Sequence, residues 1–267
     1  MNVLKITLRV NNLKIAIVTV AGISSRFNKD VSKKDKILKC IYHENNVKYS
    51  LIYQMTDKLK TYDKIIIVGG YKFTDLKEYV ESNIDKSLKE KISFVYNEHY
   101  DDLSSGYSLY LGIKETLAYD NVSEVIFVEG DLDIDFESFK KVIDSSNDVL
   151  TFNHEPIYSN KAVVLYQNDK NEYKYLFNSD HGNLTINEPF KAIFNSGQTW
   201  KFQNIELLKI ANNNFEKYLI EDTNLGIIQK YFDLIENKDD IELIGLKHWV
   251  NCNTREDYKL IRDYWEK

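Results

Sequence analysis

Short apolar runs alternate with segments of helical periodicity in the first half of the chain. Four short apolar runs are predicted strands, and the first two are rich in β-branched residues, which is typical of strands buried on both faces of a sheet. The four runs are KIAIVTV (14–20), KIIIV (64–68), KISFVY (91–96) and EVIFV (124–128). Between the runs, apolar residues recur at every fourth position, as on one face of a helix: Val47, Leu51, Met55 and Leu59, and later Leu109, Ile113 and Leu117. This order predicts an α/β fold with a mostly parallel, Rossmann-like sheet and helices on both faces.

From about Thr151 the pattern changes to short strands joined by turns rich in Asn and Asp. The predicted strands are KAVVLYQ (161–167), EYKYLF (172–177) and FKAIFNS (190–196). Two helices follow, and the chain closes with a third, TREDYKLIRDYW (254–265), in which Thr254 is the expected N-cap and Asp257 its partner in a capping box. No linker rich in Pro or Gly interrupts the chain, so residues 1–267 are expected to form one domain with a smaller mixed-strand part.

Charge and composition exclude several classes of protein. The net charge of −6 over 267 residues argues against nucleic acid as the main partner. The two cysteines, Cys40 and Cys252, are too few for a disulfide scaffold or a cysteine zinc site. No apolar run reaches the roughly 20 residues of a membrane span, and residues 1–13 do not resemble a signal peptide. We therefore expect a cytoplasmic protein without a membrane partner.

The first strand ends in a polar, flexible loop, AGISSRF (21–27). Open α/β sheets bind ligands beyond the carboxyl ends of their strands, where this loop lies. Gly22 allows backbone amides to approach a phosphate, and Arg26 carries a planar fork of donors suited to phosphate oxygens. Taken alone, such a turn after a strand is often only a turn.

Together with Lys36 in the segment KKDKILK (33–39), this loop resembles the signature of nucleotidyltransferases with a GT-A-type fold. The resemblance implies that the loop wraps a nucleoside triphosphate and that Arg26 and Lys36 neutralise its phosphates. The implied nucleotide-binding loop residues are Ala21, Gly22, Ile23, Ser24 and Ser25. Ser24 stands where the family usually has a second glycine, and Asp35 stands where it has proline. The resemblance also divides the domain into a nucleotide-binding half (14–150) and an acceptor-binding half (151–267).

Two longer segments are similar to bacterial phosphocholine cytidylyltransferases: IIIVGGYKFTDLKEYV (65–80) and FVYNEHYDDLSSGYSLYLGIKETL (94–117). In the wider group, a serine at the start of the second helix lies beside the base. The resemblance therefore implies that Ser108 contacts the base of CTP and that Gly106 gives clearance for it. The alternative is that Ser108 only caps or packs the helix.

Acidic residues follow the fourth strand in the segment FVEGDLDIDF (127–136). On an extended segment, Glu129, Asp131 and Asp133 would share one side and could converge on a hard cation. The resemblance assigns Asp131 to Mg²⁺. It also puts Asn251 and Asn253 where the family has acids that complete the metal site, so Asn253 is the expected second metal ligand.

The resemblance implies transfer of CMP from CTP to a small phosphorylated or phosphonate metabolite, with Mg²⁺ as cofactor and release of pyrophosphate. Such products are precursors of cell-surface polysaccharides or phospholipids. The predicted partners are CTP and this acceptor, and the protein is expected to be a monomer or homodimer. A GT-A glycosyltransferase and a catalytically silent nucleotide-binding protein are the alternatives.

The acceptor is expected to contact the second half of the chain. The predicted acceptor-binding residues are Gly197, Trp200 and Asp222. Trp200, Tyr158 and Tyr175 could form an aromatic wall for a quaternary ammonium group, although packing within the core is the alternative for each ring. The identity of the acceptor stays open between phosphocholine, a phosphonate, a phosphorylated amino acid and a sugar phosphate.

Overall fold

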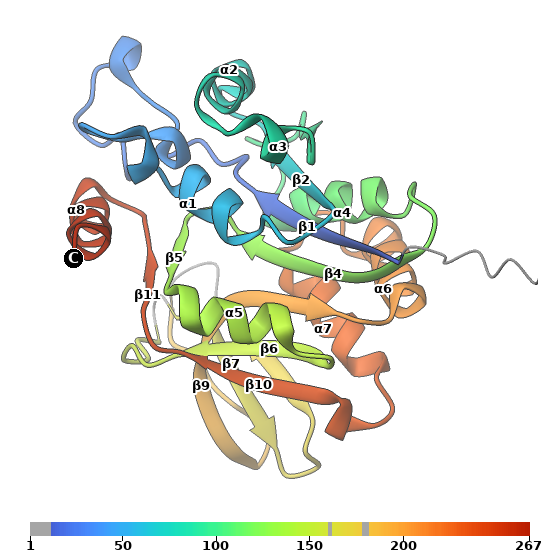
Figure 1. Cartoon of the computed structure of the whole chain (residues 1–267). Helices are drawn as coiled ribbons and strands as arrows, with labels where there is room; N and C mark the ends of the chain where they lie inside the picture. Colours follow the sequence, from blue (N-terminus) through green and yellow to red (C-terminus); the bar gives the residue numbers. More distant parts are fainter. Residues whose placement is uncertain (1–11, 160–161, 178–181) are drawn as a thin grey trace, which may run out of the picture.

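A nine-stranded mixed sheet forms the centre of the protein (Figure 1). The computed structural model describes residues 12–159, 162–177 and 182–267. Across the sheet, the strands lie in the order β10 (Ile241–Leu246), β6 (Asp148–Asn153), β9 (Phe190–Phe202), β4 (Val122–Glu129), β1 (Leu13–Thr19), β2 (Lys64–Gly69) and β3 (Ile92–Tyr96). β7 (Val164–Asn168) pairs with β9, and β8 (Tyr173–Leu176) pairs with β7.

The four strands predicted from apolar runs are β1, β2, β3 and β4. β1 pairs in parallel with both β2 and β4, and β2 pairs in parallel with β3. The central residues of β1, β2 and β4 are fully buried, as continuous apolar runs require, whereas β3 lies at the edge of the sheet and is only partly buried. The prediction of a mostly parallel α/β sheet is therefore confirmed. The N-terminal residues 1–11, and Lys161 at the start of one predicted strand, lie outside the described residues.

β9 joins the predicted meander to the main sheet. Its first part pairs with β7, and its second part runs antiparallel between β4 and β6. The pairing with β6 shifts register between Leu150 and Phe152, so that Thr151 lies opposite a bulge at residues 197–199 of β9. The meander is thus a continuation of the same sheet, because one long strand belongs to both.

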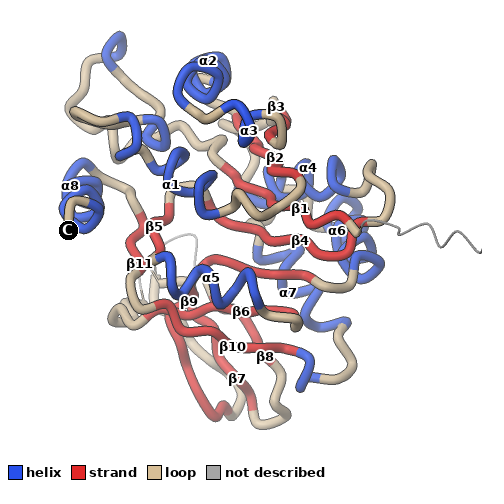
Figure 2. The backbone as a smooth tube through the Cα atoms, in the orientation of Figure 1, coloured by secondary structure: helices blue, strands red, loops and turns tan. Residues whose placement is uncertain are grey.

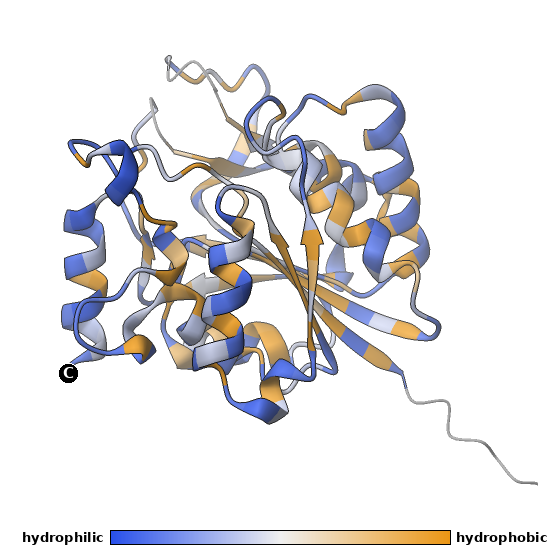
Figure 3. Ribbon diagram, turned by 90° about the horizontal axis from the view of Figure 1, so that it is seen from above, coloured by the Kyte–Doolittle hydropathy of each residue, from blue (hydrophilic) through white to orange (hydrophobic). Residues whose placement is uncertain are grey.

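Two layers of helices cover the sheet (Figure 2). Ala16 and Val18 of β1 pack in a core with α1 (Leu51–Lys58), α2 (Phe73–Asn83), α5 (Phe136–Asp144) and α8 (Arg255–Trp265). Ile15 and Ile17 point to the other face, towards α4 (Ser105–Thr116), α6 (Ile205–Tyr218) and α7 (Leu225–Leu234). A short helix, α3 (Lys86–Lys89), precedes β3. Figure 3 shows apolar strands between amphipathic helices, and no helix in the described ranges is long and apolar enough to cross a membrane.

A two-stranded ribbon brings the C-terminal segment to the acidic segment after β4. β5 (Leu132–Ile134) pairs antiparallel with β11 (Trp249–Asn251), and Leu132 is the partner of Asn251. The backbone N–H of Cys252 also donates to the carbonyl of Asp131 at 2.8 Å. Residues about 120 positions apart in the sequence therefore meet beside the carboxyl end of β4.

The predicted capping box at the start of α8 is confirmed. The Thr254 hydroxyl accepts from the Asp257 N–H at 3.2 Å, and Asp257 Oδ2 accepts from the Thr254 N–H at 2.8 Å. We expect Thr254→Ala to lower the free energy of unfolding by about 1 kcal/mol, because the variant leaves an N–H at the helix start unpaired. Thr254→Ser keeps the hydroxyl and should unfold at the wild-type denaturant midpoint. Equal midpoints for the alanine variant and the wild type would mean that the cap contributes nothing.

Candidate active site

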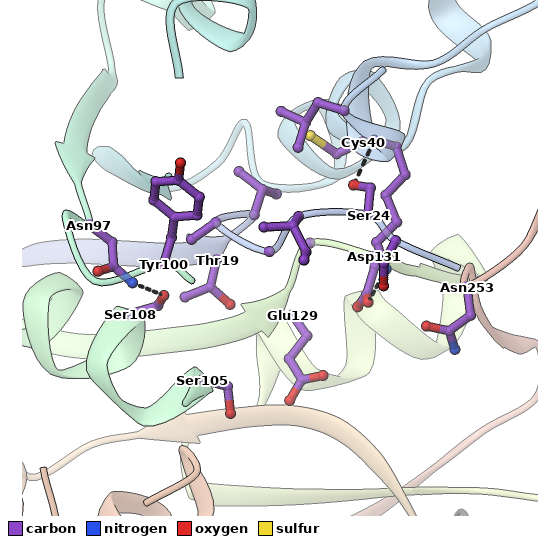
Figure 4. Close-up of a pocket in the computed structure, with 18 of the residues that line it drawn as sticks. Thr19, Ser24, Cys40, Asn97, Tyr100, Ser105, Ser108, Glu129, Asp131 and Asn253 are labelled. Atoms are coloured by element: carbon purple, nitrogen blue, oxygen red, sulfur yellow. Dashed lines mark hydrogen bonds and ion pairs between the residues drawn. The ribbon is translucent and has the colours of Figure 1, made fainter. Parts of the chain in front are cut away.

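A cavity of about 300 Å³ opens beyond the carboxyl ends of β1 and β4 (Figure 4). All five predicted residues of the loop 21–25 line it, together with Arg26. The opposite wall comes from the segment 97–108, and Glu129 and Asp131 lie at its base. We call this space the strand-end cavity. It lies where parallel α/β sheets bind their ligands.

Ser24 adopts a conformation that glycine usually supplies. Its φ is +54°, in the left-handed region, which explains why glycine is common at this position of the loop. The Ser24 side chain is buried, and its Oγ accepts from the backbone N–H of Lys39 at 3.2 Å. At Gly22, a Cβ would meet no protein atom within 4 Å. The serine hydroxyl therefore bonds to the protein, and the protein leaves open space beside Gly22.

Two basic side chains point into the strand-end cavity, and one of them differs from the prediction. Arg26 lines it as predicted, but Lys36 is half-buried and is not among its lining residues in the described chain. Lys39 lies there instead, with Nζ 2.7 Å from Asp131 Oδ2. The position expected for Lys36 is therefore wrong. The segment holds lysines at 33, 34, 36 and 39, and the short 3-10 turns that orient them are not visible in the sequence pattern.

The three acids do not share one side. Glu129 and Asp131 line the cavity, whereas Asp133 is 1% exposed and faces the core. The predicted convergence of Asp133 on a cation is wrong, because β4 ends at Glu129 and a turn precedes β5 at Leu132, so strand alternation does not continue through the segment. Asp133 bonds to Lys58 Nζ at 3.0 Å and His248 Nε2 at 2.8 Å.

The pKa values of Glu129 and Asp133 are shifted in opposite directions. Burial, and next the carboxylate of Asp131, raise the pKa of Glu129 to about 8. Burial would also raise the pKa of Asp133, but the hydrogen bond from His248 and the charge of Lys58 outweigh it and lower that pKa. Asp133 is thus a structural anion that ties β5 to α1 and to His248, the residue before β11.

Asp131 and Asn253 can hold a magnesium ion only together with a bound ligand that supplies further oxygens. Asp131 keeps Oδ1 without a hydrogen bond among the described residues, while Asn253 Oδ1 accepts from Arg26 Nη2 at 2.7 Å. No group of three or more His, Cys, Asp or Glu in the described chain is arranged for a metal. Mg²⁺ commonly binds through one or two carboxylates plus substrate phosphates, which one free carboxylate oxygen fits. The expectation for Asn253 is revised, since its oxygen is bonded to Arg26.

The predicted base-contacting serine lies on the cavity wall, but its neighbouring glycine does not. Ser108 Oγ accepts from Asn97 Nδ2 at 2.9 Å, and both side chains are buried. Gly106 packs against the loop before α7, since a Cβ there would come within 2.4 Å of the Asp222 carbonyl oxygen and the Phe215 ring. Gly106 therefore allows close packing of α4, and the expected clearance for a base is not its role.

A larger cavity of about 730 Å³ adjoins the first. The two share Arg26, Ser105, Glu129, Asp131 and Asn253 as lining residues. We call the second space the acceptor-side cavity. Its other walls come from β9, β11, α8 and the segments 155–158, 162–163 and 223–225.

Three residues predicted to line the acceptor-side cavity do not. Trp200 is fully buried, stacked on Phe127 with ring centroids 5.2 Å apart, and its Nε1 donates to the Tyr175 hydroxyl at 2.6 Å. Gly197 packs against Thr151, and Asp222 lines a separate space beside α7. The aromatic wall of Trp200, Tyr158 and Tyr175 is therefore wrong, because only Tyr158 of the three lines this cavity. The tryptophan that lines it is Trp249, which no sequence motif singled out.

A thiol in the strand-end cavity is unsuited to nucleophilic chemistry. Cys40 lines this cavity but is 1% exposed, and burial raises its pKa to about 12. The thiol therefore stays protonated at neutral pH, and protonated thiols are poor nucleophiles.

Residues 35–265 match a protein family described as domain of unknown function, DUF6564. The chain belongs to this family. The matched region starts after the loop 21–27 and includes Lys39, the acidic segment and the ribbon of β5 and β11. No curated protein matches the sequence of this DUF6564 protein.

Solved structures identify the fold of the DUF6564 protein. It is similar to the inositol-1-phosphate CTP transferase from T. maritima, with a TM-score of 0.64, 17% identity and coverage of 93% of this chain and 95% of that one. For the CTP:phosphocholine cytidylyltransferase from Streptococcus pneumoniae, the TM-score is 0.60 at 18% identity, covering 95% and 99%. A UDP-glucose pyrophosphorylase gives 0.63 at 13% identity, covering 95% and 98%. The chain therefore has the GT-A-like nucleotidyltransferase fold over nearly its full length.

Proposed function

We propose that this DUF6564 protein is a cytidylyltransferase that moves CMP from CTP to a small phosphorylated or phosphonate metabolite. The observation that carries the proposal is the pair of adjoining cavities with Arg26 and Asp131 at their junction. A transferase needs two substrates in contact at one reacting atom, and this arrangement suits a nucleotide in one cavity and an acceptor in the other.

The triphosphate would lie against the loop 21–26 in the strand-end cavity. Backbone amides and serine hydroxyls of this loop can donate to phosphate oxygens. Arg26 and Lys39 are the basic side chains among the described residues that line the cavity, and they would neutralise part of the triphosphate charge. Lys39 is already held in position by Asp131 at 2.7 Å. A positioned charge of this kind needs little reorganisation during the reaction.

In the proposed reaction, an anionic oxygen of the acceptor attacks the α-phosphorus of CTP. A new P–O bond forms, the bond between the α-phosphorus and the bridging oxygen breaks, and pyrophosphate leaves with that electron pair. The attacking oxygen is already charged, so no general base is needed. Arg26 would orient the attacking and departing oxygens from its place at the junction.

Asp131, together with the triphosphate, would hold the magnesium ion that we propose as cofactor. Bound there, the ion would supply charge neutralisation at the phosphates. Asn253 would act through Arg26 instead: its amide oxygen accepts from Arg26 Nη2 at 2.7 Å and so fixes the guanidinium.

The proposed base contact is Ser108, and it predicts a preference for CTP. Because Ser108 Oγ accepts from Asn97 Nδ2, its own hydrogen can donate to the unprotonated N3 of cytosine. We expect CTP to bind about tenfold more tightly than UTP, ATP or GTP, which corresponds to about 1.4 kcal/mol of stabilisation at saturation. Thermal unfolding with each nucleotide at equal concentration measures this preference.

Ser108→Ala is the matched variant for the base contact, since it removes the hydroxyl alone. The preference for CTP over UTP should shrink while the fold is kept. Equal stabilisation of the wild type by all four nucleotides would contradict the proposed base contact.

The experiment that tests the function is an assay of pyrophosphate release from CTP with a panel of phosphorylated small molecules. Release that depends on one class of acceptor is the expected result. Release of free nucleoside diphosphate from a nucleotide sugar would instead favour a glycosyltransferase. Nucleotide binding with no release from any pair would favour a silent binding protein.

A further inference from the structure

Gln198 has an unusual backbone conformation at the wall of the acceptor-side cavity. Its φ is +51°, in the left-handed region, where residues other than glycine, asparagine and aspartate are uncommon. It lies in the bulge of β9 opposite Thr151, next to Gly197, whose carbonyl accepts from Trp249 Nε1 at 2.9 Å. A glycine would adopt this conformation at a lower energetic cost, so the backbone is strained with glutamine in this position.

Asn251 faces Gln198 across the same wall with its hydrogen bonding incomplete. Asn251 Nδ2 approaches Gln198 Oε1 at 3.5 Å, the outer limit of a hydrogen bond. Asn251 Oδ1 is buried and has no partner among the described residues. Gln198 Nε2 also makes no hydrogen bond within the described ranges. Among the described residues, Asn251 Oδ1 is thus an acceptor without a donor, and Gln198 Nε2 is a donor without an acceptor. We call these two side chains the amide pair.

The charged groups around this cavity are mostly paired within the protein. Glu129 Oε1 accepts from Asn224 Nδ2 at 2.7 Å, and Asp131 pairs with Lys39. Asp257 accepts two backbone N–H groups at the start of α8. Among the described residues of the wall, the remaining acid is Glu155, which is exposed. Glu129 and Asp131 each keep one oxygen without a hydrogen bond among the described residues, and the amide pair adds an unmet neutral acceptor and an unmet neutral donor to the same wall.

We propose that the amide pair recognises a hydroxyl-bearing acceptor, that is, a polyol or sugar phosphate. A hydroxyl both donates and accepts, so two neighbouring hydroxyls can satisfy Asn251 Oδ1 and Gln198 Nε2 together. A quaternary ammonium group has no N–H donor and would leave the buried Asn251 oxygen unpaired, which is costly. The inference rests on the proposed function, and it narrows the acceptor to one chemical class.

The test uses sn-glycerol 3-phosphate and ribitol 5-phosphate as probes and phosphocholine as the competing probe. Binding of each to the full chain is measured by calorimetry without nucleotide, and pyrophosphate release is measured with CTP. We expect the polyol phosphates to bind more tightly than phosphocholine, and Gln198→Gly to raise their Kd and KM roughly tenfold or more. The thermal midpoint of Gln198→Gly should equal or exceed that of the wild type, because glycine relieves the backbone strain.

Two further variants separate recognition from structure. Asn121 has a φ of +58° before the amino-terminal end of β4, so Asn121→Gly makes the same kind of backbone change far from the cavity and should leave Kd and KM unchanged. Asn251→Ala should raise Kd for the polyol phosphates and leave that for phosphocholine unchanged.

The outcomes distinguish this inference from the proposed function. Turnover with phosphocholine but not with the polyol phosphates would overturn the inference and support the cytidylyltransferase. Polyol binding that depends on Gln198, without pyrophosphate release from any probe, would support the inference and count against the cytidylyltransferase. Unchanged polyol binding in Gln198→Gly, or no polyol binding by the wild type, would overturn the inference.

Discussion

Replacing Asp131 with asparagine is expected to lower the rate of CMP transfer by about 1,000-fold or more. Asp131 is a carboxylate at the junction of the two cavities with one oxygen unbonded among the described residues, and it also holds Lys39 at 2.7 Å. The change therefore weakens two sources of positive charge near the phosphates at once. Removing a single preorganised electrostatic group typically costs about 100-fold to 1,000-fold in kcat. The side chain is 24% exposed and nearly isosteric with asparagine, so the fold should survive.

Two measurements check the prediction for Asp131. Pyrophosphate release gives kcat, and calorimetric titration of Mg²⁺ with and without CTP reports the metal. We expect Mg²⁺ alone to bind weakly to the wild type and to bind well once CTP is present, because the triphosphate supplies most of the ligand oxygens.

Asn253→Asp is the control for the metal site. It adds an anion at the same junction while keeping an oxygen that can accept from Arg26. This variant should keep activity and bind Mg²⁺ at least as well as the wild type. An active Asp131→Asn variant, or tight Mg²⁺ binding by the free protein, would show that the metal is held elsewhere.

Lys39→Ala is expected to lower turnover roughly 100-fold, again as the loss of one positioned charge. Lys39 Nζ lies within the strand-end cavity, where its side chain is 18% exposed and held by Asp131. Measuring kcat and KM for CTP separates its roles, since a charge used only in binding would change KM alone.

Lys36→Ala is the matched control, three residues earlier in the same segment. Lys36 is half-buried outside the described lining of the cavity, so its loss should change turnover by less than about threefold, as for most surface substitutions. Both variants should unfold at the wild-type temperature. A larger loss of activity in Lys36→Ala than in Lys39→Ala would restore the assignment made from the sequence resemblance.

Local patterns predicted the elements whose stability depends on neighbours in the sequence. The apolar runs identified β1, β2 and β4, because a strand buried on both faces needs a continuous apolar segment, and a shorter apolar run identified the partly buried edge strand β3. The sequence also predicted the capping box of α8, because Thr254 and Asp257 form hydrogen bonds with each other within one helical turn. The geometry of strand ends, which meet at one edge of such a sheet, pointed to the loop 21–26 and to the acidic segment after β4, and the resemblance to nucleotidyltransferases singled out Asp131 within that segment.

Only the tertiary structure decided which side chains of these segments enter the site. The turn between β4 and β5 directs Asp133 into the core beside Lys58, although alternation along a strand placed it with Asp131. The bulge of β9 buries Trp200 and exposes Gln198 to the cavity, while the β5–β11 ribbon brings in Trp249 and Asn251. Side-chain direction here depends on turns, bulges and pairings between distant segments, and such long-range contacts leave no periodic signal in the sequence. The sequence by itself therefore determined the order of the elements and the edge of the sheet where the site lies, and long-range packing decided its residues.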